Sequence, residues 1–239
     1  MGIEQWGAAA GDLLLGASCH GCGVAWWGVC PQCRELVGSR RPYATRPDPT
    51  PSGFPLTVTS SAYDDVLRNV IVAHKDRQAL SLSRFLAERL ALAVHALLTA
   101  YPGSVGGREV TLVPVPSAAA AVRRRGFDAT WTMARLAARR LQIRHRVRAR
   151  RLLEQRRGVL DQAGLNAGQR AANIGQKFRL RARSDTVLVV LVDDVVTTGA
   201  SLTEAARVLA QANIAVLGAA TVAATVRRRP TVVPRVREG

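Results

Sequence analysis

The residues best suited to chemistry follow the most apolar run of the chain. Asp193 and Asp194 come directly after the stretch 187–192, VLVVLV, and a turn rich in hydroxyl groups follows them. Backbone N–H groups and hydroxyls in such a turn can surround a phosphate at the N-terminus of the next helix. Carboxylates can accept hydrogen bonds from ribose hydroxyls, so the pattern predicts a site for a sugar phosphate. Its expected members are Asp193, Asp194, Val195, Val196, Thr197, Thr198, Gly199, Ala200 and Ser201.

A simpler interpretation makes the two aspartates caps of the following helix. One aspartate would suffice for that purpose, so the adjacent pair favours a ligand site. Gly199 has two expected uses in the turn, because glycine adopts a positive φ readily and lets the backbone approach a neighbour closely.

Short β-branched runs alternate with helical patterns along most of the chain. This order predicts an α/β fold with a central parallel sheet flanked by helices. Ligands bind such sheets beyond the carboxyl ends of the strands. Segment 150–175 has weak periodicity and is expected to be a mobile loop with some helix. We expect strands at 109–115, 187–192 and 214–222, and helices at 62–73, 81–100, 127–141 and 201–212.

Four cysteines form two Cys-x-x-Cys pairs near the N-terminus. Cys19 and Cys22 make the first pair, and Cys30 and Cys33 make the second. Two such pairs supply the four thiolates of a tetrahedral structural Zn²⁺ site. The alternatives are two disulfides, which a reducing compartment disfavours, or a redox pair, which needs only one Cys-x-x-Cys. His20 lies inside the first pair and is expected to be a spacer, because four thiolates already complete the shell.

The composition divides the chain into a zinc-binding module at 1–40, a Pro-rich linker at 41–60, a main domain at 61–228 and a C-terminal tail at 229–239. The prolines of 41–55 predict a segment without regular structure. The uncharged apolar stretches are shorter than the roughly 20 residues of a membrane span. The N-terminus lacks the basic start of a secretory signal, so we expect a cytoplasmic protein.

The chain is strongly basic, with 34 Lys and Arg against 17 Asp and Glu and a net charge of +17. Segment 123–183 alone holds eighteen basic and three acidic residues. Such an excess attracts polyphosphates or nucleic acid. The coding bias of a GC-rich genome is an alternative explanation for the choice of Arg over Lys, but not for the excess itself.

Segment 191–201, LVDDVVTTGAS, resembles the ribose-phosphate motif of the type I phosphoribosyltransferases. In that motif, apolar residues precede two acids, two variable residues, and Thr-Gly with a small hydroxyl residue after it. Ser201 stands where Thr is commoner. The resemblance implies that Asp193 and Asp194 hold the ribose 2- and 3-hydroxyls, and that the turn 197–201 holds the 5-phosphate of phosphoribosyl pyrophosphate.

The order of motifs over 19–225 is similar to that of the ComF/GntX family, which is linked to natural competence and DNA uptake. Two departures leave polar contacts open: Asp128 and Ala129 stand where Asn and Gln are usual, and Val159 stands where Thr is common. Besides the cysteines and the ribose-phosphate motif, the similarity rests on Tyr63, Asp64, Lys75, the segment 113–130 (VPVPSAAAAVRRRGFDAT), Gln162, Leu165, Arg170, Asn173 and Phe178.

The resemblance also implies contacts with pyrophosphate in the loop after the first core strand, at Pro116 and Ser117. The prolines could instead only end an edge strand. Arg125 is the last of three consecutive arginines whose guanidinium groups could bind a diphosphate in a forked arrangement. Lys75 is either a ligand contact or a surface lysine, and segment 150–175 would be a flexible hood over the substrate.

The implied ligand is phosphoribosyl pyrophosphate or ribose 5-phosphate, with Mg²⁺ held by substrate oxygens and waters as much as by the protein. As an enzyme, the protein would displace pyrophosphate from ribose C1 and transfer the phosphoribosyl group to an acceptor that the sequence does not identify. No residue stands out as a general base. The alternatives are a non-catalytic DNA-handling protein, with single-stranded DNA or a DNA-uptake helicase as partner, and a ribose-phosphate sensor. An oligomer is compatible with each.

Overall fold

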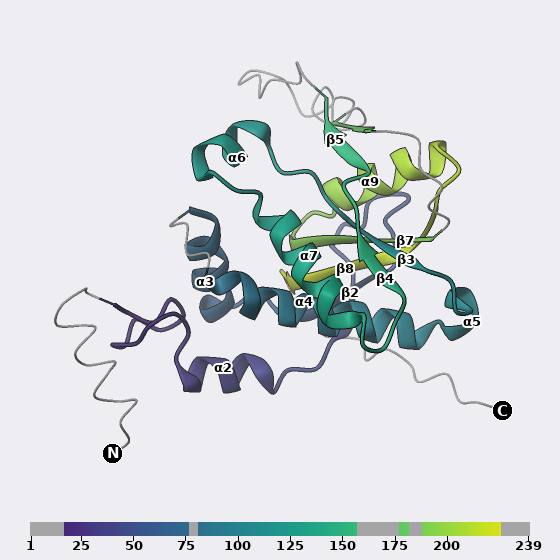
Figure 1. Cartoon of the computed structure of the whole chain (residues 1–239). Coiled ribbons are helices and arrows are strands. Elements are labelled where there is room, and N and C mark those ends of the chain that lie inside the picture. The colour runs from purple at the N-terminus through teal and green to yellow at the C-terminus, as the bar shows by residue number, and fades with distance from the viewer. Residues whose placement is uncertain (1–16, 77–80, 157–176, 182–187, 226–239) are drawn as a thin grey trace.

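The centre of the molecule is a six-stranded sheet in the order β1-β2-β8-β7-β3-β4 (Figure 1). The computed structural model describes residues 17–76, 81–156, 177–181 and 188–225. Neighbouring strands of the sheet are parallel, except that β1 is antiparallel to β2. The strands are β1 (Tyr43–Thr45), β2 (Thr57–Ala62), β3 (Val110–Pro114), β4 (Val147–Ala149), β7 (Leu188–Val196) and β8 (Ala215–Ala224), with β5 (Leu153–Gln155) and β6 (Phe178–Leu180) in a separate antiparallel pair.

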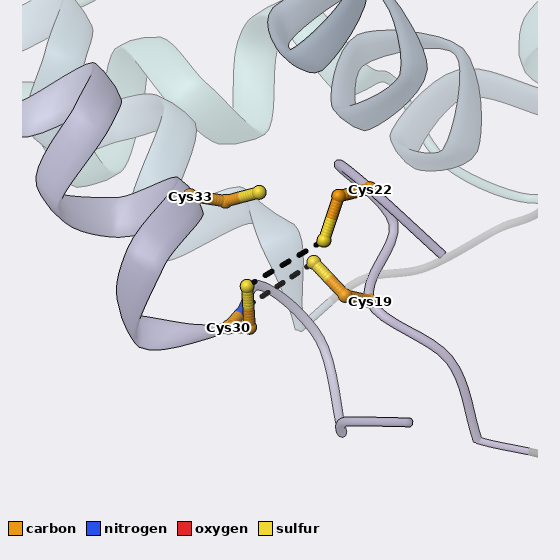
Figure 2. A group of neighbouring side chains, drawn as sticks. All are labelled: Cys19, Cys22, Cys30 and Cys33. Carbon is orange, nitrogen blue, oxygen red and sulfur yellow. Dashed lines mark hydrogen bonds between the residues drawn. The ribbon is translucent and has the colours of Figure 1, made fainter. Parts of the chain in front are cut away.

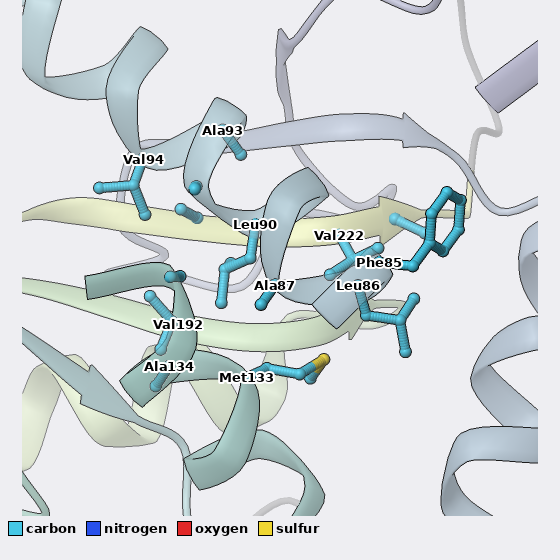
Figure 3. Packing of buried hydrophobic residues seen from close by; sticks show 14 of the residues in the cluster. Phe85, Leu86, Ala87, Leu90, Ala93, Val94, Met133, Ala134, Val192 and Val222 are labelled. Carbon is cyan, nitrogen blue, oxygen red and sulfur yellow. The ribbon is translucent and has the colours of Figure 1, made fainter. Parts of the chain in front are cut away.

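Helices cover both faces of the sheet, which confirms the expected α/β fold. They are α2 (Pro31–Gly38), α3 (Asp65–Asp76), α4 (Leu82–Ala100), α5 (Pro102–Val105), α6 (Ala119–Arg125), α7 (Ala129–Leu141) and α9 (Ala200–Gln211). Val190 and Val192 of β7 belong to the hydrophobic cluster that includes α4 and α7 (Figure 3), whereas Val189 and Leu191 belong to the cluster that includes α9. This alternation buries β7 on both faces, as a central parallel strand requires.

The predicted strands and helices occur within a few residues of their expected bounds, but the expected end of one strand was wrong. β7 does not stop at Val192 and continues through Val196, because Asp193 and Val195 still pair with residues of β8. Val195 and Val196 therefore belong to the sheet. The turn that precedes α9 is limited to residues 197–199.

The Pro-rich segment was expected to lack regular structure, and this was also wrong. It contains β1, and β2 follows within the predicted linker and pairs in parallel with β8. The short polar residues of β2 look like a linker in the sequence, yet Thr59 and Ser60 are fully buried. The hydroxyl of Ser60 donates a hydrogen bond to the carbonyl oxygen of Val222 at 2.7 Å, so its burial carries no unpaired polar group.

Segment 150–175 was expected to be a loop with some helix, but its first part contains β5, which pairs with β6. Residues 157–175 lie outside the described part of the chain, together with the proposed hood and with Val159, Gln162, Leu165, Arg170 and Asn173. Phe178 is described and lies buried in β6. Among the helices of the described residues, none is long and apolar enough to cross a membrane.

The N-terminal cysteine segment shares its core with the main sheet. Cys19, Cys30 and Cys33 belong to the same hydrophobic cluster as α3 and α4. The buried guanidinium of Arg89 in α4 donates hydrogen bonds to the carbonyl oxygens of Arg40, at 3.0 Å, and Ser60, at 3.2 Å. One side chain of α4 therefore holds both the end of the cysteine segment and β2.

A first prediction concerns Gly199, whose φ is +75° and whose added Cβ would lie 2.6 Å from Phe54 Cε2. Gly126 has a similar φ of +73° but no heavy atom within 4 Å of such a Cβ. In both alanine variants the strained backbone conformation should lower the free energy of unfolding by about 1 kcal/mol. In Gly199→Ala, overpacking should lower it by a further amount of about 1–3 kcal/mol. Urea unfolding of the two variants measures the difference. Equal losses of unfolding free energy in the two variants would show that the Phe54 side chain can move aside at no cost.

Candidate functional site

A pocket of about 460 Å³ opens where the chain leaves β2 and β3 and where β7 carries its two aspartates. α3 and α6, which lie beyond this end of the sheet (Figure 1), supply further walls. This is the position at which parallel α/β sheets bind ligands. The predicted site residues that line it are Lys75, Pro116, Ser117, Arg125, Asp193, Asp194, Val195, Thr197 and Ser201.

Four predicted members of the turn do not line the pocket. Val196 is buried in β7, while Thr198 is exposed, and Gly199 and Ala200 lie at the start of α9. Gly199 has the expected positive φ, but the close approach that we expected there is made by the side chains of Phe54 and Pro47. Its lack of a side chain thus serves packing against the N-terminal segment.

Lys75 and Asp194 form an ion pair inside the pocket between their Nζ and Oδ2 atoms. The Asp194 side chain is only 5% exposed, and that of Lys75 is 30% exposed. Burial lowers the pKa of Lys75, but the charges of Asp194 and Asp193 outweigh it and raise that pKa above its usual value. Lys75 is therefore a cation that neutralises one of the two carboxylates.

The second carboxylate, Asp193, has a different environment. Its Oδ1 accepts a hydrogen bond from the backbone N–H of Asp194 at 2.9 Å. Burial and the charge of Asp194 raise the pKa of Asp193 well above its usual range, and Lys75 lowers it in part. Hydrogen-bond donors brought by a ligand, such as a pair of hydroxyls, would stabilise the ionised form.

Asp128, where the resemblance predicts Asn, still makes polar contacts next to the pocket. Its Oδ1 caps α7 by accepting from the backbone N–H of Trp131 at 3.2 Å, and it also accepts from the hydroxyl of Ser117 at 3.3 Å. Its Oδ2 accepts from Arg151 at 3.4 Å. The carboxylate thus orients Ser117, which lines the pocket.

Of the three consecutive arginines, Arg123 and Arg124 are exposed, and Arg125 lines the pocket. Arg125 is the last residue of α6, a helix that the sequence did not predict. Gly126 follows in a left-handed conformation, which ends the helix in the usual glycine-dependent way.

Several wall residues were not predicted as site residues. In the sequence analysis Tyr63 was named only among the residues on which the family resemblance rests. The apolar residues of α3 and α6 are of types that usually pack in a core. Only the fold places them at the pocket. They are Tyr63, Ile71, Val72, Val115, Ala118, Ala121 and Thr130.

The four cysteine Sγ atoms lie within 4.8 Å of one another (Figure 2). Cys22 and Cys30 Sγ are 3.7 Å apart, close to the roughly 3.8 Å edge of a tetrahedron with Zn–S bonds of about 2.3 Å. None of the four is in a disulfide. The cluster could therefore hold one zinc ion with four sulfur ligands, and the metal would be structural.

Three of the four cysteine thiols have pKa values that differ from the usual one. Burial raises the pKa of Cys30, and burial together with the neighbouring thiols raises that of Cys33. Burial also raises the pKa of Cys19, but backbone N–H groups, that of Cys30 most of all, outweigh it and lower the pKa to about 6. Four thiolates at this separation need a bound positive charge.

Comparison with known protein families finds a match for less than half of the chain. Residues 135–235 match the family described as the phosphoribosyl transferase domain. This part of the chain is similar to a phosphoribosyl transferase domain. The matched residues of this domain include most of α7, the aspartate-bearing strand β7, the turn, α9 and β8. A comparison with curated proteins finds no match.

For the cysteine cluster, we predict about one zinc per chain in protein purified under reducing conditions. Cys22→Ser should lose the metal and unfold the N-terminal segment, because three ligands leave the shell incomplete. His20→Ala is the matched control and should keep its zinc, since His20 is no member of the cluster. Metal analysis with circular dichroism measures both, and a metal-free wild-type protein would contradict the assignment.

For the buried side of α3, we predict a pH dependence of stability that comes from His74. This side chain is 1% exposed, contacts Ser83 Oγ at 2.8 Å, and has a pKa that burial lowers to about 4. Because the folded protein disfavours protonated His74, the unfolded chain binds the proton first as the pH falls below 6.5. The free energy of unfolding should therefore be unaffected by His74 above pH 6.5 and should fall by up to about 3 kcal/mol as the pH drops toward 4.

Chemical unfolding at several pH values should therefore show that the free energy of unfolding falls more steeply with decreasing pH in the wild type than in His74→Gln. Taking the difference between the two proteins cancels pH effects that they share. Parallel stability curves between pH 4.5 and 7 would contradict the role of His74.

Proposed function

We propose that the protein binds phosphoribosyl pyrophosphate with Mg²⁺ and transfers its phosphoribosyl group to an acceptor. The observation that carries the proposal is the meeting, in one pocket, of Asp193 and Asp194, the turn at Thr197, and the Pro116–Ser117 loop. The Pro116–Ser117 loop and the two aspartates are about 80 residues apart in the sequence. They meet because β3 and β7 are neighbours in the sheet. Their presence within or beside a phosphoribosyl transferase domain supports the same ligand.

Each group has a proposed role that follows from its chemistry. Asp193 and Asp194 accept hydrogen bonds from the ribose hydroxyls. Thr197 and Ser201, with the backbone N–H groups that begin α9, bind the 5-phosphate. Pro116 and Ser117 hold the diphosphate through the loop, and the guanidinium of Arg125 adds positive charge there.

The proposed reaction breaks the bond between ribose C1 and the diphosphate oxygen and forms a bond from C1 to the acceptor. Charge stabilisation of the leaving diphosphate lowers the barrier, and Arg125 and Lys75 are the cations that line the described pocket. Mg²⁺ would supply further positive charge to the diphosphate. Asp194 already pairs with Lys75, so substrate oxygens and waters fit better than protein carboxylates as the main ligands of the ion.

The resemblance to the ComF/GntX family supports a proposed place in DNA uptake, within the cytoplasm. Direct DNA binding has weaker support, because it depends on the net charge, and part of the basic segment is engaged within the chain. The ion pairs that reduce its free charge are Arg140–Glu88, Arg148–Glu109, Arg151–Asp128 and Arg179–Glu154.

Isothermal titration with phosphoribosyl pyrophosphate and Mg²⁺ tests the proposal. The wild type should bind, and the double variant Asp193→Asn/Asp194→Asn should bind at least about tenfold more weakly, because two charge-assisted acceptors of the ribose are lost. Asp65→Asn is the matched control, since its side chain is 87% exposed, and it should bind as the wild type does. Absent binding by the wild type, or undiminished binding by the double variant, would refute the proposal.

Two further measurements separate the proposed transfer from its alternatives. Release of pyrophosphate in the presence of a panel of nucleobases and other acceptors indicates transfer, whereas binding without release indicates a sensor. Affinity for single-stranded DNA with a steep dependence on salt would favour the DNA-handling alternative.

A further inference from the structure

α3 contacts the four-cysteine cluster with its middle turn and the ligand pocket with its last turn. Asn69 Nδ2 donates a hydrogen bond of 3.1 Å to the carbonyl oxygen of Gly21, which lies between the two cysteines of the first pair. A Cβ on Gly21 would lie 2.9 Å from Cys33 Sγ and 3.1 Å from Val66 Cγ1. The first cysteine pair is thus packed tightly against both Cys33 and α3.

At the other end of the same helix, Ile71 and Val72 line the pocket and Lys75 reaches Asp194. Asn69 and Lys75 are six residues apart, which corresponds to about 9 Å along a helix. An α-helix transmits a tilt or shift of one turn to the next, because its backbone hydrogen bonds keep it rigid over this length. The cysteine cluster and the pocket therefore contact two neighbouring turns of the same rigid helix.

A second contact joins the start of α3 to the cysteine segment. Asp64 caps the helix by accepting from the backbone N–H of Leu67 at 3.1 Å, and its other oxygen forms an ion pair with Arg40. Arg40 follows α2, the helix that carries Cys33. The helix is thus tied to the cysteine segment at Asp64 and again at Asn69, before it reaches the pocket.

A helix of 12 residues owes its placement to tertiary contacts, because isolated helices of this length are marginal in water. If the thiol cluster opens, the contacts of Gly21 with Asn69 and Val66 are lost. A shift of the helix then moves Lys75 relative to Asp194, together with the apolar wall made by Ile71 and Val72.

We propose that the four-cysteine cluster is a positioning element of the ligand pocket, and that Asn69 is the residue through which it sets α3 and Lys75 opposite Asp194. Closure of the cluster by a metal fixes the helix, and opening of the cluster loosens the pocket. The affinity part of this inference rests on the proposed function, whereas its structural part does not.

The affinity test compares Asn69→Ala with Arg68→Ala in the zinc-loaded full chain. Arg68 is the matched control, because it is exposed and pairs only locally with Asp65 among the described residues. Titration with phosphoribosyl pyrophosphate and Mg²⁺ should show a loss of about two- to fivefold for Asn69→Ala, within what one hydrogen bond can contribute, and none for Arg68→Ala.

A double-mutant cycle then separates positioning from general stabilisation. In the background of Lys75→Met, Asn69→Ala should cause little further loss of affinity, because both changes act through the same contact with Asp194. Fully additive losses, or equal effects of Asn69→Ala and Arg68→Ala, would overturn the proposal.

Hydrogen exchange provides a readout that needs no ligand. Amides of residues 70–76 should exchange faster in Asn69→Ala and in Cys22→Ser than in the wild type, while those of α9 stay unchanged. Unchanged exchange at 70–76 in both variants would overturn the coupling. If the wild type fails to bind the ligand, the proposed function fails, and this measurement still decides whether the cluster positions α3.

Discussion

The pocket depends on the ion pair between Lys75 and Asp194, because Asp194 is almost completely buried near the carboxyl end of β7. A buried carboxylate without a partner is strongly destabilising, and loss of one member of such a pair costs about 3 kcal/mol or more. The pair also fixes α3 against β7, two elements that are more than a hundred residues apart in sequence. Burial and the charge of Asp194 raise the pKa of the neighbouring Asp193, and the charge of Lys75 lowers it in part. A single contact therefore connects the stability of the sheet with the electrostatics of the pocket.

The sequence predicted the α/β class, the core elements and most of the polar residues that meet in the pocket, because these follow from hydrophobic period and from a short motif. It did not predict the end of β7, because Asp193 and Asp194 are poor strand formers and only pairing with β8 keeps them in the ladder. It also missed β2, since Thr59 and Ser60 look like linker residues until a buried position supplies their partners. The apolar pocket wall could not be predicted, because Ile71 and Val72 have the same types as core residues and their role depends on where α3 ends.

The N-terminal third of the chain completes the site. Gly199, in the turn that precedes α9, packs against Phe54 and Pro47, so this turn is shaped by a segment that lies about 150 residues earlier. Arg89 fastens the same region by donating to carbonyl oxygens of Arg40 and Ser60. The cysteine cluster adds a third attachment through α3. These attachments act at different points, so the segment is built into the domain and is not a separate appendage.

The position of β2 has a consequence for any attempt to reduce the protein to the main domain predicted from the sequence, 61–228. β2 is the neighbour of β8, and β8 is buried almost throughout. A fragment that begins at residue 61 would leave the hydrogen-bonding edge of β8 open along most of its length. Open, flat and apolar edges recruit strands from other molecules. Such a fragment would expose this edge to strands from other molecules, so a piece that keeps β8 covered must start before β2.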